Sequence, residues 1–420
     1  MKKILKITSM SAFLTLFKML IGFVISKAAA VYAGPAGVVV LGQMQSLIGS
    51  VMGILNAPVS TGVIKYTSEN GDKNSFWWWR ASFIILCSIS IPVIFCMIIY
   101  SGFISYHVLG SSEYKWLIII TSLTLPVAAI GTLITSIFNG LELYRKYLIS
   151  GALSTVITFF IMIFLILKYN INGVLIAAGI QGGLTGIVLV VLAINSHWCK
   201  LSNFIGKVNK KQLKNISKFF VMTAISAMLF PATILIVRSI ISNAVGLQSA
   251  GNWQAVWRIS EAYLAVITMA LSTYYLPKLA KTNGYYNIKA EIHYVLKFIL
   301  PTIVLMATFV FFCRDLLISI LFTKEFSLAR ELFAVQLIGD VIKIISWLYA
   351  YPVLAHGKAK VYIITELSFS FLLVGLTYLF VHRFGVHGAN YAFALNYFLY
   401  LVLMRIILKR ITFDEGEGKL

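Results

Sequence analysis

Charged residues inside apolar segments are the part of this sequence best suited to chemistry. The stretch from Gly251 to Lys281 is apolar and long enough to cross a bilayer, yet it contains Arg258 and Glu261. These two residues are three positions apart, so they share one face of a helix. A charge at the centre of a membrane helix costs about 2.5 to 3.5 kcal/mol, so such side chains normally face a wet cavity or a partner.

Eight charged residues fall inside apolar segments of this kind. Together they would cost on the order of 20 kcal/mol in hydrocarbon, which exceeds the net stability of a typical domain. They must therefore line a hydrated interior or pair with one another. Five are basic and three acidic, and the formal excess of +2 favours an anionic solute. The basic residues are Lys18, Lys27, Arg238, Arg258 and Lys343, and the acidic ones are Glu261, Asp340 and Glu366.

Some of these charges have alternative explanations in the sequence. Asp340 and Lys343 are three positions apart and could form a structural ion pair instead of serving function. Trp253, Trp257 and Glu261 form one stripe on a helix. Trp257 is expected to contact a ligand, and the alternative is that the stripe serves as an anchor, since Trp253 lies close to the membrane interface.

Other polar and aromatic residues also have two possible roles. Gln43 could meet a sugar or bridge helices. The run Phe76–Arg80 is expected to form an aromatic belt at the membrane interface, with a sugar-binding platform as the alternative.

Composition defines the elements that must position these residues. With 60% hydrophobic and 12% charged residues and a mean hydropathy of +0.89, the chain is predicted to be an all-α, polytopic membrane protein. Apolar runs of about 18 residues or more predict twelve transmembrane helices. Their approximate ranges are 8–31, 37–64, 81–100, 116–138, 147–167, 173–195, 219–242, 248–276, 298–313, 331–355, 361–381 and 386–408.

The distribution of lysine and arginine predicts the orientation. Most of the 35 basic residues fall on one side if both termini lie together, so both termini are expected in the cytoplasm. This loop bias also explains most of the net charge of +21 without nucleic acid, and it suits membrane lipids with anionic headgroups. We expect an N-terminal six-helix bundle (1–195), a basic cytoplasmic linker (196–218) and a C-terminal six-helix bundle (219–420).

A weak internal repeat relates the two halves. Sliding the chain by 211 residues pairs Lys27 with Arg238 and Gln43 with Gln254. An even number of spans in each half would give the two halves the same orientation in the membrane.

Several segments resemble the polysaccharide-repeat-unit flippases. They are residues 218–281, LFAVQLIGDVIKI at 332–344, FTKEF at 322–326 and GPAG at 34–37. This family contains the O-antigen and lipid III translocases of the multidrug/oligosaccharidyl-lipid/polysaccharide exporter superfamily. The resemblance implies two six-helix bundles around a central cationic cavity, in the bacterial inner membrane. It also implies flipping of an undecaprenyl-pyrophosphate-linked oligosaccharide, for O-antigen (lipopolysaccharide) or enterobacterial common antigen biosynthesis, from the cytoplasmic to the periplasmic leaflet.

The resemblance also suggests roles for the charged residues. Intramembrane charges of the family are matched by Lys18, Lys27, Arg238, Asp340, Lys343 and Glu366, whereas Arg258 departs from the family pattern. We expect the five basic residues, with Trp257 and Gln43, to bind the substrate. Glu261, Asp340 and Glu366 are expected to carry a proton or sodium ion in an antiport cycle. A glycan polymerase and a chain-length regulator are expected partners.

Two other classes compete with this interpretation. An ion-coupled drug or small-molecule exporter would share the fold, but a positive interior suits cationic drugs poorly. A membrane-embedded polysaccharide polymerase or ligase would be expected to have a large periplasmic loop, which the spans leave no room for. The four cysteines and six histidines show no metal-ligand or nucleophile spacing. We therefore expect a transporter, not an enzyme, with no cofactor and no metal.

Overall fold

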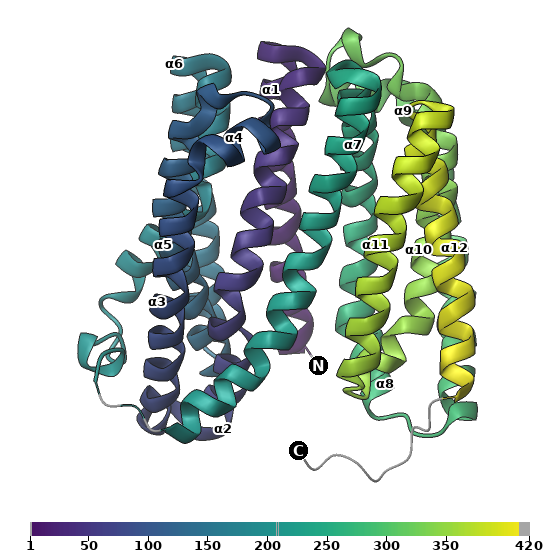
Figure 1. Cartoon of the computed structure of the whole chain (residues 1–420). Helices are drawn as coiled ribbons and strands as arrows, with labels where there is room; N and C mark the ends of the chain where they lie inside the picture. Colours follow the sequence, from purple (N-terminus) through teal and green to yellow (C-terminus); the bar gives the residue numbers. More distant parts are fainter. Residues whose placement is uncertain (1, 207, 209, 411–420) are drawn as a thin grey trace. The chain divides into compact units, whose positions relative to one another are not determined.

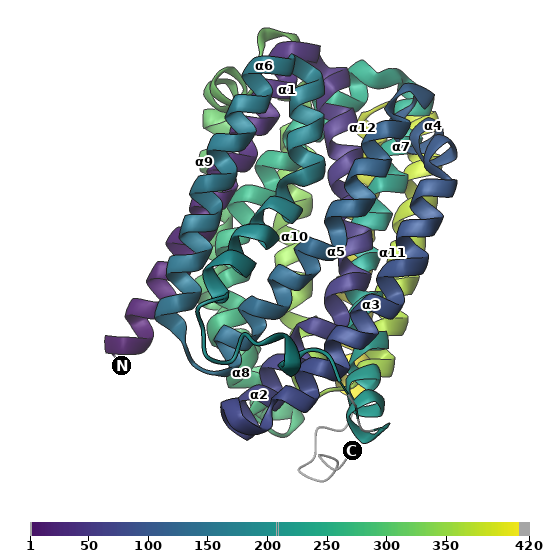
Figure 2. The ribbon, with the colours of Figure 1, turned by 90° about the vertical axis from the view of Figure 1, so that its left-hand side faces the viewer.

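The protein forms two compact helical units. The computed structural model describes residues 2–206, 208 and 210–410, and every regular element in these ranges is helical. Unit 1 comprises Met1–Tyr32 and Val40–Leu235, and unit 2 comprises Ala33–Val39 and Ile236–Leu420. Figures 1 and 2 show long helices joined by short connections in both units. The predicted domain boundaries at 195/196 and 218/219 stay predictions.

Unit 1 contains the first six helices and the start of the seventh. They are α1 (Lys2–Asn56), α2 (Thr61–Asn74), α3 (Phe76–Ile99), α4 (Ser101–Leu109), α5 (Lys115–Gly140), α6 (Tyr144–Ala193) and the first part of α7 (Lys210–Ala270). Unit 2 contains the rest of α7 and the helices that follow it. These are a π-helical turn (Leu271–Tyr275), α8 (Leu276–Ala280), α9 (Tyr285–Leu321), α10 (Ala329–Ala355), α11 (Ala359–Phe384) and α12 (His387–Arg410).

Three long helices are interrupted inside their length, as is the shorter α2 at Gly71. Non-helical backbone occurs in α1 at Ala33 and Gly34, in α6 at Asn170 and in α7 at Gly246. Gly34, Asn170 and Gly246 have positive φ angles of 57°, 52° and 83°, a region that glycine and asparagine enter more easily than other residues. Each interruption falls in a connection that the sequence predicted between two spans.

Helix α6 shows what such an interruption does. Its 50 residues would extend about 75 Å if straight, more than twice the hydrocarbon thickness of a bilayer. A Cβ atom on Gly173 would lie 2.6 Å from the backbone carbon of Leu165. The backbones at residues 165 and 173 are thus in close contact, so the chain reverses direction at Asn170.

These interruptions affect the count of membrane crossings. Among the described residues, nine helical stretches are long and apolar enough to cross a membrane. The prediction of a multi-pass, all-helical protein is confirmed. The count of twelve spans and the cytoplasmic termini stay predictions, and the three interrupted helices support the count.

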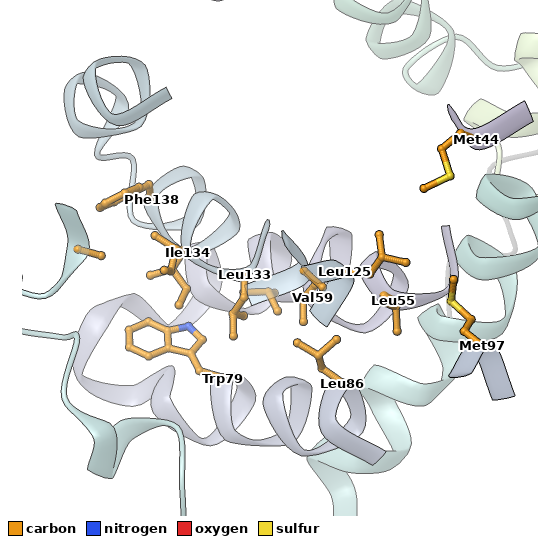
Figure 3. Packing of buried hydrophobic residues seen from close by; sticks show 14 of the residues in the cluster. Met44, Leu55, Val59, Trp79, Leu86, Met97, Leu125, Leu133, Ile134 and Phe138 are labelled. Atoms are coloured by element: carbon orange, nitrogen blue, oxygen red, sulfur yellow. The ribbon is translucent and has the colours of Figure 1, made fainter. Parts of the chain in front are cut away.

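The core of unit 1 surrounds Trp79. This side chain is fully buried in a hydrophobic cluster, and Figure 3 shows it beside Leu133, Ile134 and Phe138 of α5. Its indole Nε1 donates a 2.9 Å hydrogen bond to Thr67 Oγ1. The prediction of an aromatic belt at the interface is therefore wrong for Trp79, because the indole is enclosed in the unit's core.

The connection after α6 packs onto the same core. Trp198 makes edge contacts with Trp79 and Phe138, at ring-centroid distances of 5.8 and 5.5 Å. The Arg80 guanidinium donates from Nε and Nη2 to the carbonyl oxygen of Ser202. The first part of the predicted linker is thus held against α3, and α7 begins at Lys210.

Unit 2 contains the interruption of α1. The segment 33–39 packs against α7 so closely that a Cβ on Gly251 would lie 2.5 Å from the Pro35 carbonyl oxygen. A Cβ on Gly34 would collide with the carboxylate of Glu325. Two of the segments that carry the family resemblance, 34–37 and 322–326, therefore meet in one place.

Candidate functional site

Six of the eight charged residues predicted inside apolar segments belong to unit 2, and they lie on α7, α10 and α11. The first of them, Arg238, is only 2% exposed and donates a 2.8 Å hydrogen bond from Nε to Oε1 of Gln254. Both residues are on α7, on either side of the interruption at Gly246. Arg238 also interacts electrostatically with Glu261 and Arg258. A buried cation is thus held by a neutral amide and lies near one acid and one base.

Arg258 and Glu261, which their spacing placed on one helix face, form an ion pair. Arg258 Nη1 lies 3.9 Å from Glu261 Oε2, and the two side chains are 25% and 40% exposed. They are the most accessible charged pair in the predicted set. A solute could therefore reach these groups without rearrangement of the unit.

Asp340 on α10 is fully buried and accepts several hydrogen bonds. The Tyr263 hydroxyl donates to Oδ2 at 2.8 Å, and Gln336 Nε2 donates to Oδ1 at 3.1 Å. The Ser260 hydroxyl also bonds to this carboxyl group. Two of the three donors come from α7, so Asp340 joins α7 to α10.

Lys343, one helical turn after Asp340, lies among aromatic rings. Its ammonium is 5.0 Å from the ring centroid of Trp347 and 5.4 Å from that of Tyr397. The rings of Trp257 and Phe393 are 5.7 and 5.8 Å away. Cations within about 6 Å of a ring centroid are attracted by the ring face. Lys343 is only 6% exposed, so it is enclosed in this conformation.

Glu366 on α11 completes the acidic set. It accepts a 3.0 Å hydrogen bond at Oε1 from the Tyr400 hydroxyl of α12. Lys343 interacts electrostatically with Glu366, Asp340 and Glu261. The structure therefore brings all three predicted ion-coupling acids into the neighbourhood of one lysine.

The other predicted residues lie in unit 1. Lys18 is exposed and Lys27 half-buried on α1, and Gln43 on the same helix is 3% exposed. The charge of the predicted set divides unequally between the units. Unit 2 holds three basic and three acidic members, which cancel, so the formal excess of +2 comes from Lys18 and Lys27 on α1.

Trp257 is buried, whereas a ring that is free to bind a ligand would be exposed. It is 3% exposed, stacks on Trp253 at 5.2 Å and meets the edge of Phe393 at 5.3 Å. Trp253 is 2% exposed, so an interface anchor does not describe it either. Ligand contact by Trp257 stays a prediction.

Sequence reasoning missed the uncharged residues that hold the charges. One signal could have found some of them, since Gln336 and Trp347 lie four residues before Asp340 and four residues after Lys343. The others come from neighbouring helices, which spacing along one helix does not reveal. The missed residues are Ser260, Tyr263, Gln336, Trp347, Phe393, Tyr397 and Tyr400.

The fold is that of transporters of the MOP superfamily. A multidrug resistance MATE family transporter in an inward-facing conformation matches with a TM-score of 0.77 at 12% identity, over 94% of each chain. The lipid II flippase MurJ in an inward closed conformation matches with a TM-score of 0.76 at 16% identity, over 95% of this chain and 87% of its own. At these identities the likeness shows the fold.

The sequence matches a more particular group. The lipid III flippase of Escherichia coli K12 is 28% identical over 93% of this chain and 94% of its own length. The lipid III flippase of Shigella flexneri matches equally. No family model matches the chain. The resemblance to lipid III flippases is confirmed, and so is the prediction of a transporter rather than an enzyme, since these relatives are named flippases.

Proposed function

We propose that this protein flips an undecaprenyl-pyrophosphate-linked oligosaccharide from the cytoplasmic to the periplasmic leaflet of the bacterial inner membrane. The observation that carries the proposal is the match to lipid III flippases over 93% of the chain. The oligosaccharide is an O-antigen unit or lipid III, and the two units alternate access during the cycle.

The charges of α1 support an anionic cargo. A pyrophosphate is bound by lysine and arginine through charge-assisted hydrogen bonds. Lys18 and Lys27 are the basic members of the predicted set on α1, and Lys18 is exposed. We assign the pyrophosphate to these two lysines, with Arg258 as the accessible cation of unit 2.

Four proposed substrate contacts are buried in this conformation. They are Arg238, Lys343, Trp257 and Gln43, each less than a tenth exposed. Our proposal is that they reach the substrate only in another state of the transport cycle.

Ion coupling is proposed for the acids of unit 2. Asp340 and Glu366 are each held by a tyrosine hydroxyl, and Glu261 is half-exposed beside Arg258. Buried carboxylates of this kind commonly carry protons or cations through membrane proteins. A proton or a sodium ion would bind here while the lipid-linked sugar crosses in the opposite phase of the cycle.

The test is the lipid-linked glycan that accumulates in cells lacking this protein. We expect accumulation on the cytoplasmic face, and restoration of surface glycan by the wild-type chain. The double variant Lys18→Gln/Lys27→Gln, inserted normally, should restore less than about a tenth of it, because the excess charge is gone. Lys289→Gln, at an exposed position of α9, is the matched control and should restore it fully. The flippase proposal fails if no glycan accumulates. If glycan accumulates but the double variant restores it fully, only the assignment of the lysines is wrong.

A drug exporter is the competing proposal, and the MATE fold is its support. It predicts export of organic cations by the wild-type chain without any effect on glycan. Polymerase and chain-length regulator partners would be tested separately, by co-purification from a cell that makes the glycan.

A further inference from the structure

The four rings around Lys343 form an aromatic cage. They come from three helices: Trp257 from α7, Trp347 from α10, and Phe393 and Tyr397 from α12. The ammonium lies 5.0 to 5.8 Å from all four ring centroids. One ring beside a lysine is common, whereas four ring faces around one ammonium define a site for a cation.

The cage is built by tight packing. The ring of Trp257 meets Phe393 at 5.3 Å with an interplanar angle of 81°, and Phe393 meets Tyr397 at 4.9 Å with an angle of 69°. Gly339 on α10 leaves the room that Phe393 occupies, because a Cβ there would lie 2.6 Å from Phe393 Cδ1. The walls thus support one another and do not depend on Lys343 for contact.

The surroundings of the cage are acidic. Lys343 is attracted by Asp340 on its own helix, by Glu261 on α7 and by Glu366 on α11. Aromatic faces with nearby carboxylates are the chemistry by which proteins recognise alkylated ammonium groups. A carboxylate alone would neutralise a lysine, but it would not select the shape of an organic cation.

We propose that this cage is a site for an organic ammonium ion, and that the chain's own Lys343 fills it. The lysine acts as a tethered cation that excludes free organic ammonium ions from the cage. This assignment goes beyond the flippase proposal and does not rest on it. It also makes Lys343 a specificity-determining residue, since its side chain decides whether the site is open.

The experiment removes the tether and supplies a free cation. The purified full-length protein is titrated with tetramethylammonium chloride, and binding is measured by calorimetry and by the rise in Tm. Lys343→Ala should bind the cation at least about tenfold more tightly than the wild type, because its four aromatic faces are then open. Lys343→Arg, which keeps a cation in the cage, should not gain binding.

Two controls separate this site from general effects. Adding Trp347→Ala to Lys343→Ala removes the nearest ring and should weaken binding about fivefold to thirtyfold. tert-Butanol, a neutral molecule of similar size, and sodium chloride at equal concentration should not raise the Tm of Lys343→Ala. A variant that folds only with tetramethylammonium present also supports the proposal.

Several results would overturn the proposal. They are equal binding by the wild type and Lys343→Ala, equal binding with and without Trp347, and equal stabilisation by tert-butanol. Failure of tetramethylammonium to bind or rescue Lys343→Ala, while Lys343→Arg folds normally, would overturn it as well.

Discussion

Replacing Tyr263 by phenylalanine tests the network around Asp340. The change removes one hydroxyl, which donates to Asp340 Oδ2 at 2.8 Å, and leaves the ring in place. Tyr263, Gln336 and Ser260 all bond to this carboxyl, with Lys343 one turn away. Each of these hydrogen bonds stabilises the ionised form of the carboxyl group, and a hydrogen bond to a charged group contributes about 1.5 to 3 kcal/mol.

Two matched variants provide a comparison for the loss of stability expected in Tyr263→Phe. Tyr275 is also buried, but its hydroxyl donates at 2.8 Å to the neutral carbonyl of Leu348. Tyr275→Phe should therefore cost only about 0.5 to 1.5 kcal/mol. Tyr400→Phe, which loses the bond to Glu366, should resemble Tyr263→Phe.

The assay is thermal unfolding of the three variants in one detergent. We expect the Tm of Tyr263→Phe and Tyr400→Phe to fall further than that of Tyr275→Phe. If Tyr275→Phe lowers the Tm as much as Tyr263→Phe does, the carboxyl group of Asp340 is not a charged acceptor and the reasoning is refuted.

Two further predictions test packing and the connection between α6 and α7. Gly251→Ala should destabilise the protein by about 1 to 3 kcal/mol through overpacking, since the new Cβ would lie 2.5 Å from the Pro35 carbonyl oxygen. The control is Gly375→Ala on α11, where an added Cβ has no atom within 4 Å. This control should stabilise the protein by about 0.5 to 1 kcal/mol. Equal Tm values for these two variants would contradict the packing of 33–39 on α7. Burial raises the pKa of the Cys199 thiol, so in a variant whose only cysteine is Cys199, maleimide should label the native protein more slowly at pH 7 than the unfolded chain. Since the folded state favours the neutral thiol, its contribution to stability is present below the unfolded pKa of about 8.5 and is lost as pH rises through the folded value. Equal labelling rates in the folded and unfolded states would refute the shift.

Local features of this protein could be predicted from its sequence. Gly34, Asn170 and Gly246 lie between apolar runs and can adopt positive φ, so the interruptions of the long helices follow from hydropathy and backbone preference. Spacing alone placed Arg258 beside Glu261. These predictions succeed because each depends on residues close together in the chain.

Features made by contacts between distant segments could not be predicted. Hydropathy placed Trp79 near a membrane interface. Its enclosure became visible only in the structure, where Trp198 in the connection after α6 packs against the Trp79 ring. The partners of Lys343 come mostly from α7 and α12, and the sequence offered only Asp340. Spacing along one helix fixes a face but says nothing of which helix packs against it.

The predicted charges are divided unequally between the two units. This division suggests that attraction of an anion and binding of a cation involve different residues, which the sequence did not distinguish. Taken together, the eight intramembrane charges suggest a single cationic interior. In the structure, the basic and acidic residues of unit 2 are equal in number, and Arg238, Asp340, Lys343 and Glu366 are already held by amide, hydroxyl or aromatic groups. A set with equal numbers of basic and acidic groups has little net attraction for an anion. Lys18 and Lys27 have no acid among the eight in their own unit. Under the proposed function, attraction of an anionic cargo would therefore depend chiefly on α1, and coupling to a cation on the acids of unit 2.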